Sequence, residues 1–159
     1  MMMKVNELAE ILLSKKLLLA TAESCTGGMI AAAITGRAGS STIFDRGFIT
    51  YSNASKQDLL GVPEDVIAQF GAVSAETAAA MATGALKNSQ ADITVSVTGI
   101  AGPSGGSDEK PVGLVYIGIA TLSHHAFVEE MRFEGEREDI RAKAAAEALS
   151  LLIKAAEAI

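Results

Sequence analysis

The chain has 159 residues, of which 49% are hydrophobic and 20% are charged, so its composition is globular and excludes a disordered chain. Its formal net charge of -6 argues against a general nucleic-acid binder, which needs a basic surface. The single cysteine excludes an intramolecular disulfide and fits a reducing compartment. The apolar part near the N-terminus is too short and too interrupted by charge for a membrane span. We therefore expect one cytoplasmic domain over residues 1–159, with no signal peptide and no membrane contact.

The first part of the chain alternates between helical and strand patterns. Apolar residues at helical spacing predict an amphipathic helix over residues 6–15. A short apolar run predicts a buried strand over 17–22, and a second helix is expected over 26–34. The glycines and serines of residues 36–41 break this pattern and predict a loop.

The middle of the chain predicts one strand and three helices. Residues 46–52 form a strand candidate, and Asn53 is expected to cap a short helix over 54–60 that Gly61 ends. Pro63 and the two acidic residues after it open another helix, which ends at Gly71. Ser74 is expected to cap a helix over 75–87.

The last part of the chain predicts three strands and a long helix. The strands cover residues 93–98, 113–121 and 126–133, and the helix covers 138–158. The second and third of these strands lie so close in sequence that they should form a hairpin, with the third at an edge. Helices interleaved with strands, together with one hairpin, predict an α/β fold: a three-layer α/β/α domain with a mixed sheet.

Ser24 is the first candidate for chemistry, because it follows a predicted strand in a turn of small residues. The turn leads into a helix, and helix starts carry free backbone N–H groups that can bind an anion. The loops after three predicted strands, at residues 23–28, 50–56 and 98–106, are expected to meet at one end of the sheet.

A serine nucleophile needs a base, and the usual histidine is not available here. The chain has only His124 and His125, which are adjacent in the predicted hairpin and would point to opposite faces of a strand, so a Ser-His-Asp triad is not expected. Lys56 is the alternative base, with Tyr51 near the same strand end. The competing interpretations are a solvated lysine and a packing tyrosine. Cys25 is a rival nucleophile, but without a histidine partner it is better read as a small buried hydrophobe.

Residues 98–106 form a loop that is unusually rich in glycine. Glycine lets backbone N–H groups approach a ligand or an oxyanion closely, although a structural connector remains the alternative. The loop matches neither the P-loop nor the dinucleotide-binding pattern. Asp108 and Glu109 lack histidine or cysteine partners at ligand spacing, so no metal site is expected.

Together these motifs resemble the CinA C-terminal domain family, over nearly the whole chain. The resemblance is carried by five motifs in order: residues 22–28, residues 39–41, residues 46–53 with Lys56, residues 71–74, and residues 98–113.

The resemblance implies an amidohydrolase that converts nicotinamide mononucleotide into nicotinic acid mononucleotide and ammonia. It implies that Ser24 is the nucleophile, that Lys56 and Tyr51 assist proton transfer, and that no cofactor is needed. A non-catalytic nucleotide-binding domain and hydrolysis of a different amide remain the alternatives. Self-association into a homo-oligomer is compatible with the resemblance.

The phosphate of the substrate has several candidate binding groups, among which the sequence does not choose. They are the turn after the nucleophile, the glycine-rich loop and two arginines: Thr26, Gly27, Gly28, Thr98, Gly99, Gly102, Gly105, Gly106, Arg46 and Arg141.

Overall fold

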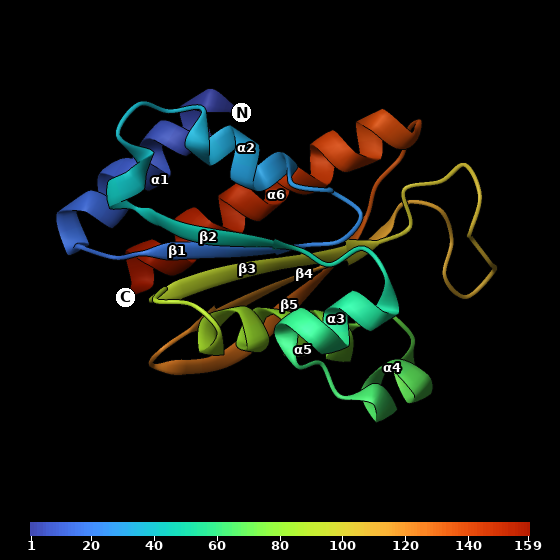
Figure 1. The fold of residues 1–159 in the computed structure, drawn as a ribbon. Helices are drawn as coiled ribbons and strands as arrows, with labels where there is room; N and C mark the ends of the chain where they lie inside the picture. The colour runs from blue at the N-terminus through green and yellow to red at the C-terminus, as the bar shows by residue number, and fades with distance from the viewer.

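The computed structural model describes all residues 1–159 as six α-helices, one short 3-10 helix (η1) and five strands (Figure 1). In chain order these are α1 (Met2–Lys15), β1 (Leu19–Glu23), α2 (Met29–Thr35), η1 (Ser40–Thr42), β2 (Phe44–Ile49), α3 (Asn53–Leu60), α4 (Glu64–Phe70), α5 (Ala75–Lys87), β3 (Ile93–Gly99), β4 (Leu114–Thr121), β5 (His124–Arg132) and α6 (Arg137–Ala158).

The five strands form one mixed sheet in the order β2-β1-β3-β4-β5. β1 runs parallel to β2 and β3, whereas β3, β4 and β5 are successively antiparallel. Helices α1, α2 and α6 cover one face, and α3, α4 and α5 lie on the other (Figure 1). The predicted three-layer fold with a mixed sheet is therefore confirmed, as are the β4–β5 hairpin and the edge position of β5.

Several predicted boundaries need correction. Ser52, not Asn53, caps α3, because its side chain accepts the N–H of Ser55. The helix predicted to begin at residue 26 begins at Met29, since Gly27 and Gly28 have φ of 57° and 101°, outside the helical region. β2 ends at Ile49 rather than at residue 52. Ser74 caps α5 as predicted, by accepting the N–H of Thr77.

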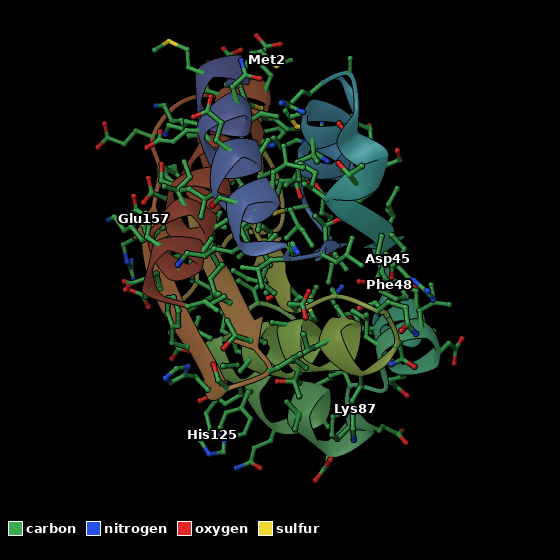
Figure 2. All side chains as sticks on the ribbon, turned by 90° about the vertical axis from the view of Figure 1, so that its left-hand side faces the viewer. Met2, Asp45, Phe48, Lys87, His125 and Glu157 are labelled. Carbon is green, nitrogen blue, oxygen red and sulfur yellow. The ribbon has the colours of Figure 1, made fainter.

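The core is built mainly of aliphatic side chains on the face covered by α1, α2 and α6. Its main cluster joins β1, β3 and β4 to these three helices, and a smaller cluster lies under α3 and α5. None of the helices combines the length and the apolarity that crossing a membrane requires. Figure 2 shows His125 at the hairpin end of the sheet, on the outside of the molecule.

Polar side chains join the other face of β3 to α5. The hydroxyls of Thr94 and Ser96 donate to the carbonyls of Ala82 and Ala78, at 2.7 and 2.6 Å. Thr98 continues the row by donating to the carbonyl of Ala72, in the connection before α5, at 2.7 Å. The apolar–polar alternation of this strand thus separates an apolar core from a hydrogen-bonded layer, and all three hydroxyls are buried and paired.

Gly84 of α5 allows α3 to approach closely. A Cβ atom at Gly84 would lie only 2.0 Å from the carbonyl oxygen of Leu60, the last residue of α3. No side chain fits between the two backbones.

This contact predicts that Gly84→Ala destabilises the protein, although alanine is normally the better helix former by about 1 kcal/mol. Forcing the helices apart should lower the free energy of unfolding by about 1–3 kcal/mol, measured by urea denaturation. Thr83→Ala, at the exposed neighbouring position, is the control and should stay within about 0.5 kcal/mol of the wild type. A more stable Gly84→Ala variant would contradict the packing.

Candidate active site

A cleft of about 320 Å³ lies at the end of the sheet where β1 and β3 finish. It is lined by the turn after β1, the start of α3, the α4–α5 connection, the glycine-rich loop after β3, and the start of α6. The predicted meeting of three loops at one sheet end is thus found. The lining residues are Ser24, Cys25, Tyr51, Lys56, Ala72, Val73, Thr98, Gly99, Ile100, Ala101, Gly102, Ser104, Gly105 and Arg137.

Ser24 is held by backbone bonds on its strand side and by Glu23 on its helix side. Its N–H donates to the carbonyl of Val97 on β3. The buried carboxylate of Glu23 accepts the N–H groups of Ile30 and Ala31, at 2.9 and 3.0 Å. The first turn of α2 is therefore already satisfied by an internal anion, which fixes the turn that presents Ser24.

Lys56 reaches Ser24 directly. Its Nζ lies 3.0 Å from Ser24 Oγ, and the side chain is only 1% exposed although it carries an amine. Lys56 stands in the first turn of α3, whose start is fixed by the Ser52 cap and whose end packs on Gly84. The close α3–α5 contact therefore helps to hold the amine against Ser24.

The surroundings of Lys56 make the neutral amine accessible near pH 8 and direct its lone pair toward Ser24. Burial lowers its pKa to about 8, because the charged form loses its hydration. The carbonyls of Thr50 and Tyr51, at 2.8 and 3.3 Å, can only accept hydrogen bonds. They use both N–H donors of a neutral amine, so its lone pair is left for the hydroxyl proton of Ser24.

Tyr51 contacts Lys56 through its backbone carbonyl, whereas its phenol contacts Arg137. The side chain is 60% exposed, and its hydroxyl accepts a hydrogen bond from Arg137 at 3.0 Å. Arg137 also donates to the carbonyl of Gly102 at 2.8 Å, so it bridges the β2–α3 connection and the glycine-rich loop. Sequence reasoning missed Arg137, because the last helix was expected to begin one residue later and no motif surrounds it.

The glycine-rich loop contributes backbone to the cleft. Thr98, Gly99, Gly102 and Gly105 line it, whereas Gly106 packs behind, against Val112. The N–H groups of Ala101 and Gly102 donate to no backbone carbonyl. The N–H of Cys25, directly after Ser24, is also free of any backbone acceptor.

The other predicted phosphate groups do not line the cleft. Thr26 is buried, and Gly27 and Gly28 lie against the side chains of Arg141 and Ile49. Arg141 donates to the carbonyls of Cys25 and Thr26, at 2.9 and 3.3 Å, and so supports the turn from α6.

Arg46 lies near the other end of the sheet, because it pairs with Ala20 at the start of β1. It is bound there by the Asp45 carboxylate and the carbonyl of Asn88, which leaves it outside the cleft.

Cys25 also belongs to the cleft lining. Burial raises the pKa of the Cys25 thiol to about 11, which keeps it protonated at neutral pH. No group of three or more histidine, cysteine, aspartate or glutamate side chains gathers where it could hold a metal ion.

Comparison with known proteins places this chain in a family. The profile of the CinA C-terminal domain matches residues 3–156. The chain belongs to the CinA C-terminal domain family. One relative, the nicotinamide-nucleotide amidohydrolase PncC of Escherichia coli K12, is 52% identical over 132 residues, which make up 83% of this chain and 80% of the relative.

Other CinA-family relatives are longer proteins. The CinA-like protein of Geobacter sulfurreducens is 51% identical over 144 residues, 91% of this chain but only 35% of the relative. This chain spans about a third of the length of the first curated relatives that it matches.

Solved structures of the CinA family share the whole fold. The competence/damage inducible protein CihA of Agrobacterium tumefaciens is 47% identical, with a TM-score of 0.89, over 95% of this chain and 94% of that one. A CinA superfamily protein of Klebsiella pneumoniae is 33% identical, with a TM-score of 0.95, over 99% and 98% of the two chains.

The environment of Cys25 predicts a poorly reactive thiol. With a pKa of about 11, the thiolate fraction at pH 8 is near one in a thousand, so alkylation by iodoacetamide should be about 100-fold slower than for free cysteine. The rate should keep rising up to pH 11, followed by intact mass. Fast alkylation at pH 8 would instead make Cys25 a competing nucleophile.

Proposed function

We propose that this protein is an amidohydrolase that cleaves the carboxamide of nicotinamide mononucleotide, with Ser24 as nucleophile and Lys56 as general base. The contact of 3.0 Å between Lys56 Nζ and Ser24 Oγ in a cleft carries the proposal. The printed function of the PncC relatives, which match most of this chain, supports the substrate. Residues 1–159 act as one catalytic domain that needs no cofactor, located in the cytoplasm, where the enzyme can self-associate.

The first half of the reaction acylates Ser24. Neutral Lys56 takes the hydroxyl proton while Ser24 Oγ attacks the carboxamide carbon, which forms a tetrahedral oxyanion. The ammonium of Lys56 then gives this proton to the leaving nitrogen, so that ammonia departs and an ester on Ser24 remains. The phenol of Tyr51 is not needed as a relay, because the two reacting groups are in direct contact.

The second half hydrolyses the ester. Lys56, again neutral, takes a proton from a water molecule that attacks the ester carbon, and Ser24 Oγ leaves with that proton. The backbone N–H groups of Cys25 and of Ala101 or Gly102 are our candidates for the oxyanion hole, since each is free of backbone acceptors and belongs to the cleft lining. One such donor contributes about 3 kcal/mol to the transition state.

Arg137 is our candidate for the substrate phosphate. It is the arginine that lines the cleft, and its guanidinium suits a phosphate. The loop backbone around Gly102 and Gly105 stands beside it. The buried Glu23 carboxylate makes the start of α2 unsuitable, because that helix end already binds an anion.

Replacing the nucleophile tests the activity. Ser24→Ala should lower ammonia release from nicotinamide mononucleotide by at least about 10³-fold, since the covalent route is lost. Binding of the nucleotide, measured by calorimetry, should remain. Near-full activity of this variant would refute the serine mechanism. Binding by the wild type without ammonia release would favour a nucleotide-binding domain, and release only from other amides would change the substrate.

The pH profile tests the base. Because Lys56 must be neutral, kcat/KM should rise tenfold per pH unit at low pH and level off near pH 8, the pKa of the free enzyme. Lys56→Arg keeps a donor but holds its proton, so it should lose at least about 100-fold in kcat/KM at every pH. Circular dichroism of this variant is the control for folding. A profile that is flat from pH 6 to 9 would contradict the assignment.

A further inference from the structure

We propose that Lys110 is a positioning residue that holds two walls of the cleft together and thereby sets the affinity for the substrate. The glycine wall is residues 98–107, of which the part up to Gly105 lines the cleft, and the connection wall is residues 71–74. Neither wall carries the nucleophile or the base, which stand on the turn after β1 and on α3. The kinetic part of this inference rests on the proposed function.

Lys110 binds the end of the helix that leads into the connection wall. Its Nζ donates to the carbonyl of Phe70, the last residue of α4, at 2.6 Å. Gly71 follows with φ of 83°, and a Cβ atom there would lie 2.9 Å from the same Nζ. The free carbonyls of a helix C-terminus favour a cation, so the Lys110 ammonium binds there at a fixed position.

Lys110 is also joined firmly to the glycine wall. Its carbonyl accepts the N–H of Ser107 at 2.8 Å, and its own N–H donates to Ser107 Oγ at 3.0 Å. Two residues later, the side chain of Val112 fills the space at Gly102, where a Cβ atom would lie 2.5 Å away. The segment therefore connects the Lys110 ammonium to the backbone that lines the cleft.

A second bond already joins the walls at the sheet. Thr98 Oγ1 donates to the carbonyl of Ala72 at 2.7 Å. The side chains of Ser74 and Thr77 in turn bind the carbonyl of Gly71, at 2.9 and 2.7 Å, and stiffen the connection wall. The Thr98 bond joins the two walls only at the base of the loop after β3, and Figure 1 shows this loop extending away from the sheet. The Lys110 bond supplies the second point that fixes the distance between the walls.

The consequence is a separation of binding from chemistry. Loss of the Lys110 bond leaves the contact between Ser24 and Lys56 in place but loosens the surfaces that line the rest of the cleft. Such a change weakens the binding of the substrate in the ground state and in the transition state alike. It therefore raises KM and leaves kcat unchanged.

The test compares Lys110→Met with Lys15→Met. Lys15 makes the same kind of bond, to the carbonyls of Ala156 and Glu157 at the end of α6, but lies outside the cleft lining. Pulsed hydrogen exchange of the Gly71 and Ser107 amides measures how often each wall opens without substrate. Steady-state ammonia release measures KM and kcat. Lys110→Arg, which can still donate to Phe70, tests rescue.

The expected result for Lys110→Met is faster exchange at both amides, KM raised by about 5-fold or more and kcat within about 2-fold of the wild type. Lys110→Arg should restore these values, and Lys15→Met should leave them unchanged. Identical behaviour of the two methionine variants, or a loss of kcat at constant KM, would overturn the inference. If the wild-type protein releases no ammonia, the proposed function fails, and hydrogen exchange alone then decides whether Lys110 holds the walls.

Discussion

The site depends on one constraint, the burial of an amine among groups that can only accept hydrogen bonds from it. Desolvation brings the pKa of Lys56 to about 8, and two backbone carbonyls set the direction of its lone pair. A solvated lysine beside Ser24 would have a pKa near 10.5, so its neutral, proton-accepting form would occur far less often at the same pH. The neighbouring backbone therefore decides which way the hydrogen bond between the two side chains runs.

The fold provides this environment through the ends of its strands. β1 ends in the turn that carries Ser24, β2 leads to the carbonyls that hold Lys56, and β3 leads to the glycine-rich loop. The turn that carries Ser24 is supported from opposite sides, since Glu23 binds the start of α2 and Arg141 binds the turn from α6. Rigid elements on both sides thus fix the hydroxyl of Ser24 at the edge of the cleft.

Much of the fold could be predicted from the sequence, because apolar periodicity and caps such as Ser74 are local signals. The boundaries that differ lie where local signals compete. Gly27 and Gly28 delay α2, and Ser52 rather than Asn53 makes the capping bond. The pairing of Ser24 with Lys56 was suggested by the motifs, but its distance depends on the approach of α3 to Gly84, which no sequence pattern reveals.

Local sequence patterns also fail to show which arginine lines the cleft. Arg46 and Arg141 were reasonable phosphate ligands by residue type, yet one lies near the far end of the sheet and the other supports backbone carbonyls. Arg137 lines the cleft only because α6 begins there, next to Tyr51 and Gly102. Long-range contacts of this kind follow from the three-dimensional path of the chain and are invisible to local patterns.

The row of hydroxyls between β3 and α5 has a geometric consequence. Alternate strand residues are about 6.8 Å apart, and helix carbonyls four residues apart are separated by about 6.0 Å, so Thr94 and Ser96 match Ala82 and Ala78 almost in step. The hydroxyl spacing on β3 therefore matches the carbonyl spacing on α5 over these two bonds. One residue inserted between Thr94 and Ser96 would turn one of the two hydroxyls away from α5, so their spacing along β3 is tied to the helix pitch.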